Sequence, residues 1–373
     1  MHARGQSPSR FKAVGSVAVH TFESRQNMTT TAHQSMDGHH VNAMAGDQAG
    51  GEPTSLADYE TLPQGHFYDP DAEYEPDPEY AATLAPDAAR QRRERVGPTG
   101  RTLPYFPIPN PVTDHGPAKI IAMCNQKGGV GKTTSTINLG AALAEYGRRV
   151  LLVDFDPQGA LSVGLGVNPM ELDLTIYNLL MERGMAADEV LLKTAVPNMD
   201  LLPSNIDLSA AEVQLVSEVA RESSLQRALK PLMADYDYIV IDCQPSLGLL
   251  TVNALTAAHK VIVPLECEFF ALRGVALLTE TIEKVQERLN PELELDGILA
   301  TMYDSRTVHS REVLARVVEA FDDHVYHTVI GRTVRFPETT VAGEPITTYA
   351  SNSVGAAAYR QLAREVLARC HAE

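Results

Sequence analysis

The stretch Gln126-Lys127-Gly128-Gly129-Val130-Gly131-Lys132-Thr133-Thr134 decides the fold of this chain. It follows an apolar run over 119–124, which predicts a β-strand, and it precedes a helical pattern over 133–146. Glycines allow a loop backbone to wrap closely enough for its N–H groups to point at phosphate oxygens. The start of the following helix adds a dipole that favours negative charge. Strand, glycine-rich loop and helix, in that order, predict a phosphate-binding loop.

The residues of this loop have predicted roles. We expect Lys132 to bridge the β- and γ-phosphates of a nucleotide, and Thr133 to offer its hydroxyl to Mg²⁺. The other residues predicted to bind the nucleotide are Lys127, Gly128, Gly129, Val130, Gly131 and Thr134. Gln126 stands where the pattern G-x-x-x-x-G-K-T has its first glycine, and Lys127 is an additional lysine at the start of the loop. Taken alone, Lys127 is also compatible with an ordinary surface lysine.

Two acidic segments follow the loop along the chain. The first is Val153-Asp154-Phe155-Asp156-Pro157-Gln158-Gly159, in which we expect Asp156 to orient the attacking water of a phosphoryl transfer. Asp154 is predicted to support the magnesium shell or the loop, and either carboxylate is alternatively a turn or cap residue. The second segment is the apolar run 238–241 followed by Asp242, whose carboxylate is predicted to hold Mg²⁺.

Short β-branched runs alternate with longer helical patterns from residue 119 onward. Strands are predicted at 119–124, 149–153, 238–241, 260–265 and 298–302, and helices at 133–146, 274–289, 310–321 and 355–370. Buried strands that alternate with helices indicate an α/β fold, a doubly wound and mostly parallel sheet of the P-loop NTPase type. Ligands of such sheets lie beyond the carboxyl ends of the strands, which is where the motifs above fall.

The first part of the chain differs in composition. Residues 1–112 mix polar and acidic residues without periodicity and predict a disordered, acidic, low-complexity tail, followed by a folded domain over 113–373. The basic cluster at 90–95 is either a contact for DNA or an acidic partner, or simply a solvated segment. The net charge of −17 restricts nucleic-acid binding to a local basic patch. No membrane-spanning run or secretion signal is apparent, and the four cysteines form no CxxC pair.

The loop with its additional lysine resembles the deviant Walker A motif of the ParA/MinD family of P-loop ATPases. The first acidic segment resembles the family motif D-x-D-P-Q-G. The segment Asp242-Cys243-Gln244-Pro245-Ser246-Leu247-Gly248 resembles D-C-P-P-S-L-G, with Gln244 in place of the first proline. Further similarity at 264–274, 301–307 and 334–338 points to the chromosomal ParA/Soj branch and covers the chain from about residue 119 onward.

This resemblance implies a slow, Mg²⁺-dependent ATPase that partitions DNA. Two copies would dimerise around two ATP molecules, with Lys127 reaching the partner's nucleotide. Lys127, Lys132 and Asp156 would then be the catalytic residues. The dimer would bind DNA without sequence preference through Arg306 and Arg335, with Arg332 added to the patch, unless these arginines are only solvated charges. A ParB-like protein would stimulate hydrolysis and release the DNA. The implied location is the cytoplasm, on the nucleoid.

Three alternatives are open from the sequence. A MinD-like membrane-associated ATPase would need an amphipathic C-terminal helix, but the stripe of Tyr359, Leu362, Val366 and Leu367 is more typical of a helix packed on the sheet, so no stable membrane insertion is expected. An iron–sulfur member of the superfamily would need paired cysteine ligands. A scaffold that binds nucleotide without hydrolysis would not need all of Lys132, Asp156 and Asp242, although Gln244 leaves room for it.

Overall fold

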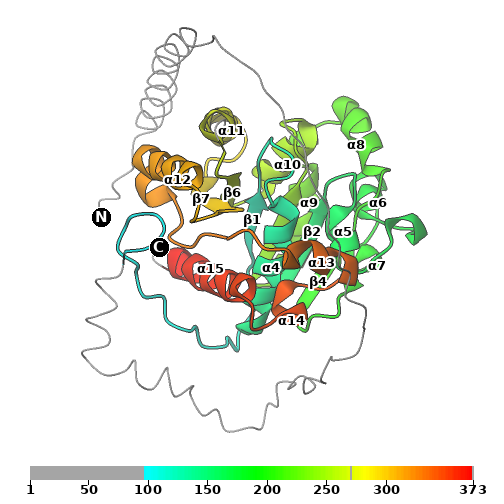
Figure 1. Cartoon of the computed structure of the whole chain (residues 1–373). Helices are drawn as coiled ribbons and strands as arrows, with labels where there is room; N and C mark the ends of the chain where they lie inside the picture. The colour runs from blue at the N-terminus through cyan, green and yellow to red at the C-terminus, as the bar shows by residue number, and fades with distance from the viewer. Residues whose placement is uncertain (1–95, 269–270, 372–373) are drawn as a thin grey trace, which may run out of the picture. The chain divides into compact units, whose positions relative to one another are not determined.

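The computed structural model describes residues 96–268 and 271–371. Its described strands form one seven-stranded sheet in the order β3-β4-β2-β5-β1-β6-β7 (Figure 1). All neighbouring pairs are parallel except β3 and β4, which run antiparallel at one edge. The strands are β1 (Lys119–Met123), β2 (Val150–Phe155), β3 (Leu192–Lys193), β4 (Met199–Leu202), β5 (Tyr238–Cys243), β6 (Lys260–Glu266) and β7 (Glu294–Thr301).

Helices connect these strands and cover both faces of the sheet. The α-helices are α4 (Lys132–Glu145), α5 (Ala160–Gly164), α6 (Ile176–Met181), α7 (Ala187–Val190), α8 (Leu208–Gln214), α9 (Ser224–Leu229), α10 (Leu249–Ala257), α11 (Ala271–Arg288), α12 (Val308–Phe321), α13 (Arg335–Ala342), α14 (Ile346–Tyr349) and α15 (Val354–His371). Short 3₁₀ turns add η2 (Pro169–Glu171), η3 (Leu215–Ser217), η4 (Arg221–Ser223), η5 (Lys230–Ala234) and η6 (Asp322–His324).

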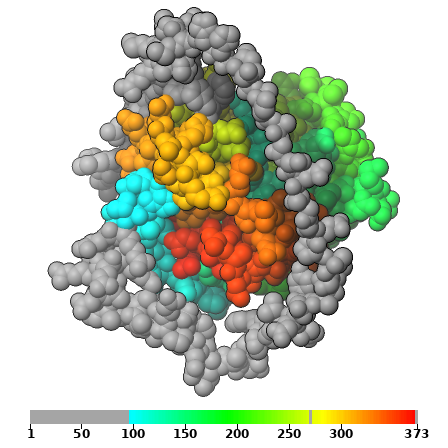
Figure 2. Space-filling model, in the orientation of Figure 1, coloured from blue at the N-terminus to red at the C-terminus, as the bar shows by residue number. Residues whose placement is uncertain are grey.

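Residues 96–112, which precede the sheet, lie against the domain. Val96 and Thr102 form an antiparallel bridge. Between them, Arg101 donates from Nη1 to the carbonyl oxygen of Asp322 at 2.8 Å, and from Nη2 to that of Val325. Figure 2 shows this segment, in cyan, beside α12 and α15. The predicted tail extended to residue 112, whereas the structure describes the chain from residue 96 onward and has Arg101 hydrogen-bonded to the domain. Residues 1–95, including the basic cluster at 90–95, lie outside the described residues.

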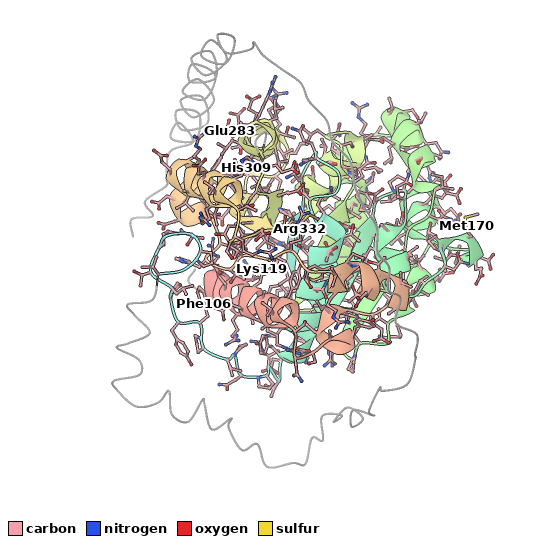
Figure 3. The ribbon with its side chains drawn as sticks, in the orientation of Figure 1. Phe106, Lys119, Met170, Glu283, His309 and Arg332 are labelled. Carbon is pink, nitrogen blue, oxygen red and sulfur yellow. The ribbon has the colours of Figure 1, made fainter. Side chains whose placement is uncertain are left out.

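The core consists of two apolar layers, one on each face of the sheet. Successive side chains of a strand point to opposite faces. Accordingly, Ile120 and Ala122 of β1 pack in the layer with α9, α10, α11 and α12, whereas Ile121 and Met123 pack in the layer with α4 and α15. Figure 3 shows side chains filling the space between sheet and helices. Burial on both faces explains why the strands read as continuous apolar runs in the sequence.

The predicted fold class is confirmed, and the predicted strands and long helices all exist. Differences lie mainly at their ends: β7 begins at Glu294 rather than 298, and α11 begins at Ala271 rather than 274. The strands β3 and β4 and the short helices α5–α10 were not predicted individually. Their runs of two to nine residues are too short for a clear periodic pattern.

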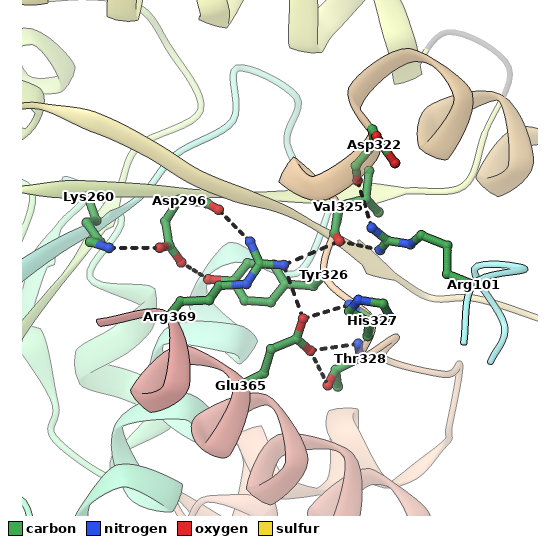
Figure 4. A network of polar contacts seen from close by, with 10 residues as sticks. All are labelled: Arg101, Lys260, Asp296, Asp322, Val325, Tyr326, His327, Thr328, Glu365 and Arg369. Atoms are coloured by element: carbon green, nitrogen blue, oxygen red, sulfur yellow. Dashed lines mark hydrogen bonds and ion pairs between the residues drawn. The ribbon is translucent and has the colours of Figure 1, made fainter. Parts of the chain in front are cut away.

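A buried polar network fixes the C-terminal helix to the segment that follows β7 (Figure 4). Glu365 of α15 is fully buried and accepts hydrogen bonds from the backbone N–H of His327 at 2.8 Å and from the N–H and hydroxyl of Thr328 at 2.9 and 2.8 Å. Arg369 donates to the same carboxylate and stacks over the ring of Tyr326 at 4.2 Å. These hydrogen bonds satisfy the buried Glu365 carboxylate. They therefore stabilise the position of residues 327–328, which precede Arg332 in the chain.

Candidate nucleotide-binding site

The glycine-rich loop lies at the carboxyl edge of the sheet, between β1 and α4, as predicted. Gly129 and Gly131 have φ of +74° and +81°, which residues with a side chain rarely adopt. Neighbouring strand ends hold the loop: the Thr301 hydroxyl donates to the carbonyl of Val130 at 2.8 Å, and the Asn125 amide donates to the carbonyl of Pro264 at 2.7 Å. The loop is therefore shaped by the fold before any ligand binds.

Lys132 lies buried across this loop. Lys132 is the first residue of α4. Its Nζ donates to the carbonyl oxygen of Lys127 at 3.2 Å. An ammonium group in this position lies next to the loop N–H groups and the positive end of α4, where phosphate oxygens are favoured. The phosphate contact of Lys132 stays a prediction, and the position of its ammonium group at the loop is compatible with it.

Thr133 and Asp242 meet at the end of β5. The Thr133 hydroxyl donates to Oδ2 of Asp242 at 2.6 Å. Asp242 is fully buried, and its Oδ1 has no hydrogen-bond partner among the described residues. Burial, followed by the nearby charge of Asp154, raises the pKa of Asp242 to about 8. A hydroxyl and a buried carboxylate with an unsatisfied oxygen fit a hard cation such as Mg²⁺, which would favour the charged form.

Asp154 and Asp156 do different things in the structure. Asp154 is paired with Asp242 in the β2–β5 ladder, and its Oδ2 accepts from the N–H and hydroxyl of Ser162 at 2.8 and 2.7 Å. Burial raises the pKa of Asp154 to about 6 despite these hydrogen bonds. Asp154 thus anchors α5 to the sheet. Asp156 follows β2 directly, is partly exposed, and accepts from the N–H of Gln158 at 3.0 Å through Oδ1.

Lys127 makes contacts that the sequence did not predict. Its ammonium group lies 3.1 Å from Oε2 of Glu266 and 2.5 Å from Oε2 of Glu268, at the end of β6 and just after it. Burial lowers the pKa of Lys127, but the hydrogen bonds that its ammonium group donates to Glu268 and Glu266 outweigh burial, and the net shift of the pKa is upward. The lysine side chain is 47% exposed. It is therefore held at the surface, paired within its own subunit.

The three arginines predicted to bind DNA all pair with carboxylates. Arg306 is bidentate with Asp304 at 2.9 and 2.8 Å. Arg335, the first residue of α13, donates to Glu338 at 2.8 Å. Arg332 donates to Oε1 of Glu266 at 3.2 Å, so Glu266 binds both Arg332 and Lys127.

All three arginine side chains are at least half exposed. Their placement leaves the guanidinium groups accessible but partly neutralised. In the view of Figure 3, Arg332 lies near the centre of the ribbon and Met170 lies at its margin.

A separate cavity of about 430 Å³ lies at the amino ends of the parallel strands. Arg149 and Tyr236, which precede β2 and β5, line it, together with Lys193 and Asp200. These residues stand at the amino ends of the parallel strands, opposite the glycine-rich loop. The cavity is therefore not part of the nucleotide site.

The structure also bears on the alternatives. The stripe of Tyr359, Leu362, Val366 and Leu367 on α15 is buried against the core, at 0–3% exposure, so its predicted packing on the domain is confirmed. Among the described residues, no helix is both long and apolar enough to cross a bilayer. Within the same ranges, no group of three or more His, Cys, Asp or Glu side chains is placed to hold a metal ion. Cys124, Cys243 and Cys267 are buried free thiols.

The chain belongs to the class of P-loop nucleotide-binding proteins. The features that define this class here are the parallel sheet, the glycine-rich loop between β1 and α4, and the aspartate at the end of β5. Comparison with known proteins refines this class. A family model described as "AAA domain" matches residues 118–295. An uncharacterized protein of Mycobacterium tuberculosis is 68% identical over 274 residues, which are 74% of this chain and 86% of that protein.

Two further relatives carry functional names. Chromosome-partitioning ATPase Soj of Treponema pallidum is 49% identical over 67% of this chain and 98% of its own. A crystal structure of cobyrinic acid a,c-diamide synthase from Mycobacterium smegmatis, with bound ATP analog and magnesium, is 46% identical with a TM-score of 0.60, over 67% of this chain and 94% of that one. The chain belongs to the ParA/Soj family of chromosome-partitioning ATPases, which confirms the resemblance seen in its motifs.

Proposed function

We propose that this chain is an ATP-dependent dimerising switch that partitions DNA. The ATP-bound dimer binds DNA without sequence preference, and hydrolysis stimulated by a ParB-like protein releases it. The observation that carries this proposal is the position of Lys127, which starts the phosphate loop yet extends to the surface, half exposed, toward Glu266 and Glu268. A half-exposed lysine in this position reaches a nucleotide bound by a second copy once it leaves these two carboxylates.

ATP binding rests on the loop and its buried neighbours. The loop N–H groups and Lys132 bind the phosphates, and Thr133 and Asp242 hold Mg²⁺, in agreement with the ATP analog and magnesium of the M. smegmatis relative. When bound, Mg²⁺ neutralises the charge that develops on the phosphate oxygens. Asp156, at the same sheet edge and partly exposed, orients the attacking water. Hydrolysis is slow, because the bound nucleotide is the signal.

DNA binding rests on Arg306, Arg335 and Arg332. Contacts from arginine to phosphate give binding that ignores sequence and weakens as salt rises. In the subunit as it stands, Asp304, Glu338 and Glu266 partly neutralise these arginines. Two copies in a dimer would present the arginines twice, which increases affinity without new contacts. The corresponding location in the cell is the cytoplasm, on the nucleoid.

Co-sedimentation with DNA tests this function. Purified protein is centrifuged together with long duplex DNA in the presence of ATP, ADP or no nucleotide, at two salt concentrations. We expect co-sedimentation only with ATP, and less of it at the higher salt. The Arg288→Glu variant controls for net charge, because Arg288 is an exposed residue at the end of α11 and is not one of the three arginines proposed to bind DNA. Intact ATP hydrolysis without DNA binding in any state would overturn the DNA-partition part of the proposal.

A further inference from the structure

The side chain of Gln244 is held by a glutamate from a different part of the chain. Gln244 follows β5 and lies two residues after Asp242. Its Nε2 lies 3.3 Å and 3.4 Å from the two carboxylate oxygens of Glu212, on α8. Both side chains are partly buried. A carboxamide that faces both oxygens of one carboxylate is held in one orientation, because the charge strengthens each contact.

The Glu212 carboxylate also lies close to the end of this loop. A Cβ on Gly248 would lie 2.0 Å from Oε1 of Glu212, so a side chain there would displace the carboxylate from its present position. Gly248 is the N-cap of α10, a helix of nine residues, and a negative charge next to a helix N-terminus is favourable. Glu212 thus contacts the beginning of the loop through Gln244 and lies against its end at Gly248.

The same loop borders the phosphate loop. A Cβ on Gly128 would lie 4.0 Å from Cβ of Pro245, so the two loops are in van der Waals reach of each other. The side of the phosphate loop that Pro245 borders is its beginning, next to Lys127. Residues 244–248 are therefore in contact with Glu212 on one side and lie next to the phosphate loop on the other.

We propose that Glu212 is a positioning residue for ATP hydrolysis: through Gln244 it fixes the loop 244–248 beside the phosphate loop. The inference rests on the proposed ATPase function. Among the described residues, the Glu212 carboxylate accepts hydrogen bonds from Gln244 and from no residue of the phosphate loop. Without the Glu212 carboxylate, the loop 244–248 takes up a wider range of positions. A smaller fraction of these positions aligns the reacting groups. ATP binding is retained, because the loop N–H groups, Lys132 and Thr133 are unchanged.

Steady-state ATP hydrolysis by the full chain separates this role from general destabilisation. We expect Glu212→Ala to lower kcat by roughly three- to tenfold, the range expected when a single hydrogen-bonded contact is lost, with KM for ATP within about twofold of wild type. Glu212→Gln retains an oxygen that accepts from Gln244 and should restore most of kcat. The matched control is Glu218→Ala, which removes an exposed carboxylate from the segment that follows α8.

The coupling is tested in a second background. Gln244→Met keeps the side-chain volume and removes the amide, so Glu212→Ala should have little further effect on kcat in that variant. Equal effects of Glu212→Ala in both backgrounds, or an unchanged or increased kcat, would overturn the proposal.

Hydrogen–deuterium exchange gives a readout that does not depend on turnover. Glu212→Ala should speed exchange in a peptide covering 244–250 and leave 126–134 unchanged. Unchanged exchange over 244–250 would overturn the positioning role. A wild-type chain that hydrolyses no ATP would contradict the proposed function instead, and the exchange data would still decide whether Glu212 positions the loop.

Discussion

The ammonium group of Lys127 lies 2.5 Å from the carboxylate of Glu268, and this contact holds it within its own subunit. Glu266 contacts the same ammonium group at 3.1 Å and also binds Arg332. A lysine in these pairs must leave them before it can reach a phosphate on a second copy. In the proposed switch, the ion pairs of Lys127 with Glu266 and Glu268 therefore oppose dimerisation, whereas ATP bound by the partner favours dimerisation.

Removing the carboxylate should make dimerisation easier. With a non-hydrolysable ATP analogue, Glu268→Gln is expected to dimerise at a protein concentration a few-fold lower than wild type, because an exposed ion pair contributes only about 0.2–1 kcal/mol. Sedimentation velocity over a concentration series measures this. Lys127→Ala should bind the analogue and remain monomeric. Dimerisation of Lys127→Ala at wild-type concentrations would exclude this lysine from the dimer contact.

The Lys132→Ala variant should lose ATP binding. Lys132 is a buried cation that donates to the loop carbonyl of Lys127, and the remaining loop N–H groups do not replace its charge. A fluorescent ATP analogue titrated into the variant measures the loss, and circular dichroism checks that α4 is still folded. Tight binding by this variant would contradict the assignment of the phosphate loop.

Replacing Asp156 should separate ATP binding from hydrolysis. Asp156→Ala leaves Lys132, Thr133 and Asp242 in place and removes the carboxylate proposed to orient water, so we expect an ATP dimer that persists while phosphate release falls by roughly 100-fold or more. Phosphate release and the lifetime of the dimer are measured on the same sample. Asp188→Ala, at an exposed position in α7, is the charge-matched control. Normal turnover by Asp156→Ala would remove it from this role.

His259 should make folding stability depend on pH. Its Nδ1 accepts the N–H of Ile120 at 2.9 Å, which requires the neutral ring. Burial, with the charge of Lys119, lowers the pKa of His259 below its ordinary value. Below about pH 6.5 the unfolded chain binds a proton that the folded chain resists, so this part of the stability is present above that pH and is lost as the pH falls through the lowered pKa.

Urea unfolding at pH 7.5 and 5.5 checks this effect. His259→Gln keeps an acceptor that does not titrate, so its free energy of unfolding should fall less between the two pH values than that of wild type. An equal fall in both proteins would assign the pH dependence to other groups.

The sequence was sufficient for the parts of the site that are contiguous along the chain. The phosphate loop needs only its own glycines, Lys132 and Thr133. The parallel sheet brings Asp242 close to it, because the loop follows β1 and Asp242 lies at the carboxyl end of β5. The contacts of Lys127 were not predictable in this way. Lys127 and Glu268 are 141 residues apart, and nothing local to either residue indicates the other.

The same reasoning explains why Glu212 was not recognised. It lies in α8, a helix of seven residues, and its relation to Gln244 depends on how that helix packs beside the loop after β5. Residues 96–112 were assigned to the tail on composition alone, which does not indicate that the guanidinium of Arg101 donates to two carbonyl oxygens of the domain. Local pattern predicts elements, whereas pairings between distant side chains follow from the tertiary structure.

The carboxylate partners of the arginines offer a test of DNA binding in both directions. Arg335→Glu should weaken ATP-dependent DNA binding and reduce its dependence on salt, while ATP-driven dimerisation survives. Asp304→Asn should strengthen DNA binding and increase the salt dependence, because Asp304 holds Arg306 through two hydrogen bonds and, with its pKa lowered to about 2 by them, stays charged at any working pH.

Fluorescence anisotropy with labelled duplexes of two unrelated sequences, at several salt concentrations, measures both effects. Arg288→Glu is the control for net charge. Unchanged affinity in Arg335→Glu together with unchanged affinity in Asp304→Asn would move the DNA site away from these arginines. Loss of affinity on only one of the two sequences would contradict binding through phosphates alone.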